Sequence, residues 1–304
     1  MLHKIFSAVF CSAAVFALTG CGLFQSAYPE QFPANWKEKE TYTESKRELA
    51  PGLTAYHFHF KDYADGVPLS FHAVVADWKK TGGKLRFAVK AMSDKTGSVA
   101  SAGTLVSATG TECDAAGKPL TAVKSAGTIF EPANAAKRIK GHVLVSAKEY
   151  FPMIVKSSPV ALSEKGFENA IQGMLLAKDG KSVFSRPMSG TGAYTAIGLN
   201  QEKQLMILLV VDGYHEKESP GVSFSELPQI LLALGAKDVL CINAGPVGVL
   251  ALEAENGNGM EIVSYPSDGG IFDHAGARPA QNLLVFEKAP VTAKVEAKKK
   301  TAVK

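Results

Sequence analysis

Short apolar runs with strand-like character dominate the first half of the chain after residue 52. They read LTAYHFHF, LSFHAVVADW, KLRFAVKA and GTLVSA, and turn-rich segments such as KDYADGVP and KKTGG separate them. Runs of this length that are rich in β-branched and aromatic residues and bounded by turn residues are typical of β-strands. The pattern therefore predicts sheet strands in this half.

The second half predicts two strands, a helix and a further strand in succession. AYTAIGLN and KQLMILLVVDG read as a strand pair around the turn NQEK, SFSELPQILLALG as a helix, and KDVLCIN as a buried strand. Ser225 is expected at the N-cap of the helix and Gly235 just after its end. The fold class predicted from this order is α+β or mixed α/β, a single domain with a mixed β-sheet and flanking helices.

Polar residues follow two of these strands where each one ends. Asp212-Gly213 closes one strand, and Asn243 lies where the stretch VLCINAGPVGVL passes from a strand into a glycine-proline turn. Because the ends of adjacent parallel strands meet at one edge of a sheet, we expect Asp212 and Asn243 to face the same cleft. The alternative for Asn243 is a strand-end side chain that hydrogen-bonds its own turn.

The first residues have the pattern of an export signal. Lys4 precedes the apolar run IFSAVFCSAAVFA, which is too short to span a membrane, and LTGC closes it. These last four residues resemble the lipobox of bacterial lipoproteins, which implies a signal peptide over residues 1–20 and lipidation at Cys21. Gly22 is compatible with the outer membrane, so the expected location is the cell envelope, on the periplasmic face of the outer membrane. A plain secretory signal that is cut elsewhere is the alternative.

Composition divides the rest of the chain into three parts. Residues 21–51 are polar and predict a tether, residues 52–287 are long enough for one domain with a sizeable core, and the Lys/Ala/Val-rich residues 288–304 predict a disordered basic tail. The formal net charge is +4. No nucleic-acid partner is expected, because the tail lacks aromatic residues and the chain carries an export signal.

Two cysteines remain outside the predicted signal and lipidation site. Cys113 and Cys241 would lie in a compartment that permits disulfides, so they could pair. Cys241 stands in the apolar run VLCIN and is equally well read as a small buried hydrophobic residue.

Several segments, in order, resemble the phosphodiester glycosidase family, whose domain is of the N-acetylglucosamine-1-phosphodiester alpha-N-acetylglucosaminidase type. They are TAIGLN, LLVVDGY, GVSFSELPQILLALGAKDVLCINAG, YPSDGG and RPAQNLLVF, and they cover roughly residues 170–287. The resemblance implies hydrolysis of a sugar-1-phosphodiester or related glycan. Its site would hold Asp212 and Asp268 as catalytic carboxylates and Arg278 on the phosphate, which suits an oxocarbenium-like transition state with a phosphate leaving group.

The chain departs from the family pattern at several site positions. Tyr194 stands where the family typically has Arg, and Asn243-Ala244-Gly245-Pro246 stands where it has an Asp followed by glycines. Asn243, Gly245, Ser267 and Tyr194 are the expected substrate-binding residues. Since Asn243 cannot ionise, the predicted activity is reduced or altered. The alternative is a catalytically inactive lipoprotein that binds a glycan or sugar phosphate or takes part in envelope assembly.

Histidines in the predicted sheet do not lead to an expected metal site. His57 and His59 would share one strand face with His72 opposite them, but no carboxylate is spaced in sequence to complete a set of ligands. Asp273 and His274 could add a base or a metal ligand to the loop after Asp268. No cofactor is predicted, and dependence on a divalent metal stays open.

Overall fold

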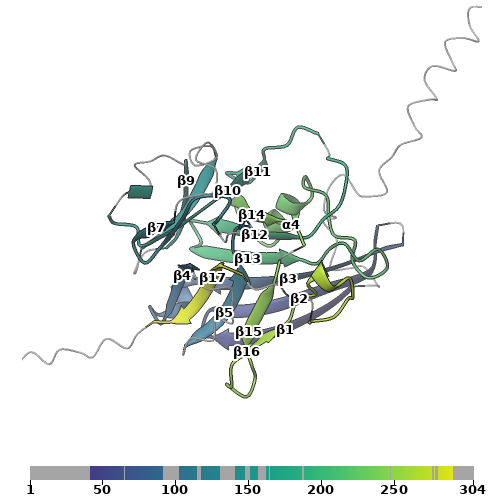
Figure 1. Ribbon diagram of the computed structural model, residues 1–304, viewed down its shortest axis with the longest axis horizontal. Coiled ribbons are helices and arrows are strands. Elements are labelled where there is room, and N and C mark those ends of the chain that lie inside the picture. The colour runs from purple at the N-terminus through teal and green to yellow at the C-terminus, as the bar shows by residue number, and fades with distance from the viewer. Residues whose placement is uncertain are drawn as a thin grey trace, which may run out of the picture.

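Two β-sheets make up the computed structural model, which describes residues 42–64, 66–91, 103–114, 118–130, 141–147, 151–156, 162–163, 165–186, 188–246, 248–275, 277 and 280–289 (Figure 1). The larger sheet has twelve strands, with the main order β1-β2-β3-β13-β12-β14-β10-β6-β7, and β8, β9 and β11 attached at β10. The smaller sheet has five strands in the order β16-β15-β5-β17-β4.

The strands of the larger sheet come from almost the whole length of the described chain. They are β1 (Tyr42–Ala50), β2 (Leu53–Ala64), β3 (Val67–Asp77), β6 (Val123–Ser125), β7 (Thr128–Phe130), β8 (His142–Ser146), β9 (Met153–Lys156), β10 (Asn169–Lys178), β11 (Lys181–Ser182), β12 (Tyr194–Asn200), β13 (Leu205–Val211) and β14 (Asp238–Ala244). The smaller sheet consists of β4 (Leu85–Ala91), β5 (Thr104–Thr109), β15 (Leu250–Glu253), β16 (Met260–Ile262) and β17 (Asn282–Lys288). The strands predicted from the apolar runs are confirmed.

The predicted fold class, a mixed α/β sheet with flanking helices, is wrong. Every strand pair among the described residues is antiparallel. Two short α-helices accompany the sheets in the described part of the chain, α2 (Trp78–Thr81) and α4 (Leu227–Ala233), together with the single 3₁₀ turn η3 (Ser267–Gly269) and two helical residues at 162–163. The protein is therefore mainly β.

The strand, helix and strand unit exists, but its two strands are not neighbours. β12 lies between β13 and β14 and pairs antiparallel with both, so β13 and β14 run parallel to each other one strand apart. Their ends still lie at the same edge of the sheet. The sequence pattern predicted β12 as a strand but not its place between β13 and β14, because local periodicity does not report which strands pair.

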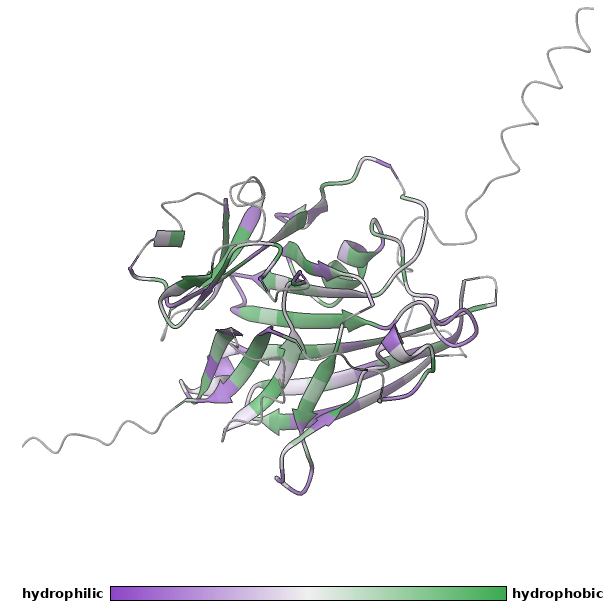
Figure 2. Cartoon of the chain, viewed as in Figure 1, coloured by the Kyte–Doolittle hydropathy of each residue, from purple (hydrophilic) through white to green (hydrophobic). Residues whose placement is uncertain are grey.

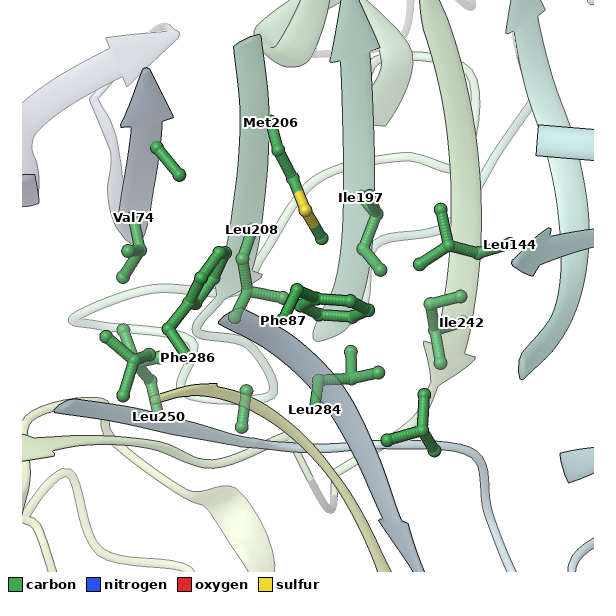
Figure 3. Packing of buried hydrophobic residues seen from close by; sticks show 14 of the residues in the cluster. Val74, Phe87, Leu144, Ile197, Met206, Leu208, Ile242, Leu250, Leu284 and Phe286 are labelled. Carbon is green, nitrogen blue, oxygen red and sulfur yellow. The ribbon is translucent and has the colours of Figure 1, made fainter. Parts of the chain in front are cut away.

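The main core lies between the two sheets (Figure 3). Alternate residues of the central strands, among them Val74, Leu208 and Ile197, meet Phe87 and Phe286 from the smaller sheet. Figure 2 shows that the strands facing this layer are mostly hydrophobic. Burying such side chains contributes about 1.5–3 kcal/mol each, so this layer fixes how the smaller sheet sits on the larger one.

The opposite face of the larger sheet packs against α4 and its flanking loops. Leu227, Ile230 and Leu231 of the helix join the second core cluster, and the TAIG glycine, Gly198, allows close contact because a Cβ there would lie 2.7 Å from that of Ala236. The N-cap expected at Ser225 is wrong. Glu226 is the N-cap.

A reciprocal pair before the helix explains this difference. Ser223 Oγ accepts from the Glu226 backbone N–H, and Glu226 Oε2 accepts from the Ser223 N–H, an arrangement like a capping box. Ser225 Oγ instead accepts from the Met188 N–H. Gly235 has φ +105°, as expected for a residue that ends a helix.

The sheet extends beyond the expected start of the domain. Residues 42–50, which fall within the range read as a tether, form β1 and pair with β2. This edge strand has a run of consecutive polar residues with mostly exposed side chains, which is why composition alone favours a linker. Within the described ranges, no helix has the length and apolarity needed to cross a membrane. The predicted signal peptide, Cys21 and the tail from residue 290 lie outside the described residues.

Candidate functional site

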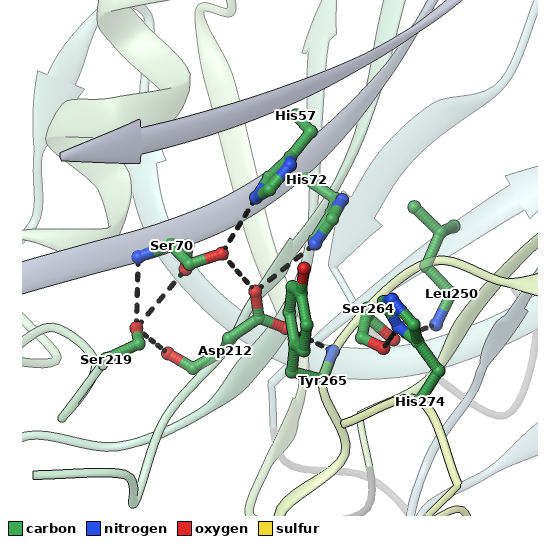
Figure 4. Close-up of polar contacts among 9 residues, drawn as sticks. All are labelled: His57, Ser70, His72, Asp212, Ser219, Leu250, Ser264, Tyr265 and His274. Carbon is green, nitrogen blue, oxygen red and sulfur yellow. Dashed lines mark hydrogen bonds and ion pairs between the residues drawn. The ribbon is translucent and has the colours of Figure 1, made fainter. Parts of the chain in front are cut away.

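Asp212 follows the last residue of β13 and lies at the end of the larger sheet (Figure 4). It is 2 % exposed, and both carboxylate oxygens are held by protein donors. The Ser70 hydroxyl donates to Oδ2 at 2.6 Å, and the Tyr265 backbone N–H donates to Oδ1 at 2.9 Å. Ser70 belongs to β3, while Tyr265 follows β16 of the smaller sheet, so the two sheets fix this carboxylate together.

Two histidines from the N-terminal hairpin lie beside Asp212. His72 Nε2 is 3.2 Å from Asp212 Oδ2, and His57 Nε2 is 3.0 Å from Ser70 Oγ. The two imidazole rings stack with centroids 4.2 Å apart and planes 10° apart. Burial and then the neighbouring His72 lower the pKa of His57 to about 4, so this imidazole is neutral at neutral pH.

The turn after Asp212 is also tied to β3. Ser219 Oγ donates to the Asp212 carbonyl at 2.9 Å and accepts from the Ser70 N–H at 3.0 Å. A Cβ on Gly213 would lie 2.5 Å from the Ala193 nitrogen, so only glycine allows the backbones to approach this closely. The Asp-Gly pair therefore combines a buried carboxylate with a close backbone contact.

Aromatic side chains follow Tyr265 in the loop that borders the site. Tyr265 stacks on Phe272 with centroids 4.0 Å apart, and the ring centroid of His274 lies 4.4 Å from that of Tyr265. His274 Nδ1 is 2.8 Å from the Ser264 carbonyl oxygen. These contacts hold the loop that positions the Tyr265 N–H against Asp212.

Asn243 lies on the same face of the larger sheet as Asp212, opposite Thr195 of β12. Its amide Nδ2 donates to the Gly110 carbonyl oxygen at 3.2 Å, so the side chain joins β14 to the smaller sheet rather than to its own turn. Its Oδ1 is buried without a hydrogen-bond partner, as is the Thr195 hydroxyl. Asn243 is 3 % exposed, so its side chain is buried between β14 and the smaller sheet rather than presented to solvent.

The loop after Asn243 contacts both the start of β12 and the loop that holds Tyr265. The Gly245 N–H donates to the Ala193 carbonyl oxygen at 3.1 Å, and the Ser267 hydroxyl donates to the Pro246 carbonyl oxygen at 3.3 Å. Ser267 thus joins η3 to the loop after Asn243. Asp268 is half-buried in η3, three residues beyond Tyr265.

Tyr194 lies on the other face of the sheet. It alternates with Thr195 along β12 and packs in the cluster around α4, with its ring 5.5 Å from that of Phe224. Burial raises the pKa of Tyr194 to about 12. The structure therefore does not bring Tyr194 to the face that carries Asp212 and Asn243. Arg278 lies outside the described residues.

Both thiols of the domain are free. Cys241 is buried, and its pKa is raised to about 12 by burial, while Cys113 is half-buried with Asn282 Nδ2 at 3.4 Å. The disulfide that the sequence allows is not formed, and Cys241 is a small buried residue, one of the two alternatives for it.

The sequence pattern does not single out Ser70, Ser219 or Tyr265 for the candidate site, and it predicts no metal site at His57 and His72. Alternation alone places Ser70 and His72 on one strand face, which was an available signal. The missing carboxylate is Asp212, which lies 140 residues after His72 in the sequence and could be found only through strand pairing.

Oxygen and imidazole groups thus converge on one buried carboxylate at the sheet end. The ligand atoms of His57, His72 and Asp212 all lie within 4.8 Å of one another. Such a group can orient an imidazole for proton transfer or ligate a metal ion, and the half-buried Asp268 adds a second carboxylate on a bordering loop.

Comparisons with known proteins agree with this architecture. The family model of phosphodiester glycosidases matches residues 80–287. A search of curated protein sequences finds no match.

Solved structures with similar folds include an enzyme domain from a vertebrate. The catalytic domain of zebrafish N-acetylglucosamine-1-phosphodiester alpha-N-acetylglucosaminidase, auto-inhibited by its pro-peptide, matches with a TM-score of 0.59 and 16% identity over 81% of this chain and 88% of that one. A hypothetical protein from Synechocystis matches with a TM-score of 0.54 and 12% identity over 78% and 62%. A putative exported protein from Burkholderia pseudomallei matches with a TM-score of 0.53 and 10% identity over 82% and 97%.

Proposed function

Since this chain belongs to the phosphodiester glycosidase family, we propose that it hydrolyses a sugar-1-phosphodiester, or a related glycan phosphodiester, at the sheet end that carries Asp212. The observation that carries the proposal is the fixed, buried carboxylate of Asp212, which strands and loops from both sheets hold in one place. A site that is held in this way can stabilise developing positive charge without reorganisation.

The two carboxylates would have different roles. Asp212 accepts two hydrogen bonds from the protein, so it is suited to electrostatic stabilisation rather than to attack on a sugar. Asp268 stands on a bordering loop and is more accessible, so it is the better candidate for direct contact with the anomeric carbon. The phosphate leaves readily, and Arg278 is proposed to hold it.

A binding role without hydrolysis is the second candidate. The observation that favours it is Asn243, whose amide is used to hold the Gly110 carbonyl and which supplies no charge. In that case the same face would recognise a glycan or a sugar phosphate.

Sugar release from an N-acetylglucosamine-1-phosphodiester tests the proposal. The full chain should release the sugar, and Asp268→Asn should abolish the release. Asp179→Asn is the matched control, because Asp179 is 83% exposed in its side chain and has φ +50°, which asparagine tolerates. Binding of the sugar phosphate without release would favour the second candidate, and neither release nor binding would contradict both.

We also propose that the protein is a lipoprotein of the bacterial cell envelope, anchored through Cys21. The support is the sequence pattern of residues 1–21. Metabolic labelling with an alkyne fatty acid should label the chain. The Cys21→Ser variant should not be labelled and should be absent from the outer-membrane fraction. Equal labelling of the two proteins would overturn the proposal.

A further inference from the structure

His72 carries a buried nitrogen that the protein leaves without a hydrogen bond. The residue is 3 % exposed, and its Nε2 is directed at Asp212 (Figure 4). Nε2 lies 3.2 Å from Asp212 Oδ2 but is not aligned for a hydrogen bond with it. A buried polar atom without a partner is costly, so a group that binds both atoms would be stabilised here.

The spacing of these two atoms fits a shared metal ion. In a tetrahedral Zn²⁺ site with metal–ligand distances of about 2.0–2.1 Å, the ligand atoms lie about 3.3 Å from one another. This is close to the 3.2 Å between His72 Nε2 and Asp212 Oδ2. His57 supplies a third ligand atom within 4.8 Å of both. Two imidazoles and one carboxylate are a common ligand set of zinc sites that keep a fourth position for water.

The local charge also favours a cation. Among the salt bridges within the described ranges, the one made by Asp212 is to His72, and no lysine or arginine is paired with it. The Asp212 carboxylate accepts hydrogen bonds from the Ser70 hydroxyl and the Tyr265 N–H, and both of these donors are neutral. A divalent cation would offset this buried charge more fully.

His57 must turn to complete the site. Its ring now stacks on His72 and its Nε2 faces Ser70 Oγ, so the two histidine lone pairs do not point at one position. His57 is half-buried, so one side of its ring is open to solvent, and a turn of the side chain would break its contact with Ser70 Oγ. Ser70 and the Tyr265 N–H would remain as partners that orient the Asp212 carboxylate, as outer groups do around zinc ligands.

We propose that His57, His72 and Asp212 bind one transition-metal dication of the Zn²⁺ class. His57 and His72 precede the segment that matches the family model, residues 80–287, so this site joins the N-terminal hairpin to the family domain. The proposal concerns metal binding alone and does not depend on the proposed hydrolysis.

Competition with a chromophoric chelator tests the site with Zn²⁺ itself, on the full chain after removal of metal. We expect one equivalent of Zn²⁺ to bind, and His72→Gln and His57→Gln each to weaken binding at least about 10²-fold. His142→Gln is the matched control, because His142 is a partly exposed strand histidine on β8, and it should bind as the natural chain does. Circular dichroism verifies that each variant is folded.

A second readout separates the proposed ligands from the thiols. Co²⁺ should give the visible absorption of a tetrahedral nitrogen and oxygen site without a thiolate charge-transfer band, and Zn²⁺ should raise the melting temperature of the natural chain but not of His57→Gln. If no equivalent of Zn²⁺ binds, or if His57→Gln and His72→Gln bind as tightly as the natural chain, the proposal is wrong.

Discussion

The Ser70 hydroxyl donates a hydrogen bond of 2.6 Å to Asp212 Oδ2, and the two residues are also joined by the Asp212 N–H, which donates to the Ser70 carbonyl at 3.1 Å. β3 thus holds the carboxylate that ends β13, although 142 positions separate the two residues. This contact makes the N-terminal hairpin part of the site.

Replacing Ser70 by alanine should therefore destabilise the protein through the site itself. Ser70 is fully buried, and the change leaves a buried carboxylate oxygen short of a donor, so we expect a loss of about 1.5–3 kcal/mol in the free energy of unfolding. Urea denaturation measures it. Ser45→Ala, on the exposed face of β1, is the control and should change little. Equal stability of the two variants would show that the contact is unimportant.

Asp212→Asn tests the charge of the same residue while its shape is kept. The asparagine oxygen can still accept from the Tyr265 N–H, so the variant should fold. If the site hydrolyses a phosphodiester, the loss of negative charge should lower kcat by about 10²-fold or more with a smaller effect on KM. Steady-state kinetics on the natural chain and the variant measure this, and an unchanged kcat would remove Asp212 from the reaction.

Gly213→Ala should disturb the strand end by a steric route. The new Cβ would lie 2.5 Å from the Ala193 nitrogen and 2.7 Å from the Gly192 carbonyl carbon, and backbone atoms cannot move aside cheaply. We expect a loss of more than about 2 kcal/mol in the free energy of unfolding. Gly166→Ala is the matched control, because nothing lies within 4 Å of a Cβ there. Thermal melting of the two variants should separate them clearly.

Glu226→Gln should change how stability depends on pH. Burial raises the pKa of Glu226 above its ordinary value of 4.5, so the folded state favours the protonated carboxyl. The stability that the protonated carboxyl of Glu226 contributes is fully present below pH 4.5 and is lost as pH rises through the raised pKa. Gln keeps an acceptor for the Ser223 N–H without the charge, so its stability relative to the natural chain should increase from pH 4.5 upward. Denaturation across this pH range decides it, and a constant difference would contradict the assignment.

Asn243→Asp should be destabilising rather than a simple restoration of the family residue. Asn243 Nδ2 donates to the Gly110 carbonyl, and a carboxylate would face that oxygen without a proton. We expect a loss of about 1–3 kcal/mol at neutral pH, and a smaller one in acid where the carboxyl can donate. Urea denaturation at both pH values measures it. A more stable variant would show that Asn243 has another partner.

Much of the fold could be predicted element by element. The apolar alternation of β2 to β5 and the runs around β12, β13 and α4 correctly located strands and helix, because the period of side-chain burial is a local property of the chain. The fold class was missed because β12 separates β13 from β14, which no local pattern reports. The helix start was displaced because Ser223 and Glu226 form the reciprocal cap and Ser225 does not.

By itself the sequence determined which chemical groups stand at the end of β13, namely the Asp-Gly pair at residues 212–213. It also carried the family pattern of the second half. Only the tertiary structure decided which groups share that place. Strand pairing over long sequence separations brings His57, His72 and Ser70 to Asp212, and side-chain alternation along β12 turns Tyr194 away from it. The physical reason is that residue type fixes what a side chain can do, whereas its partners depend on register between strands that are distant in sequence.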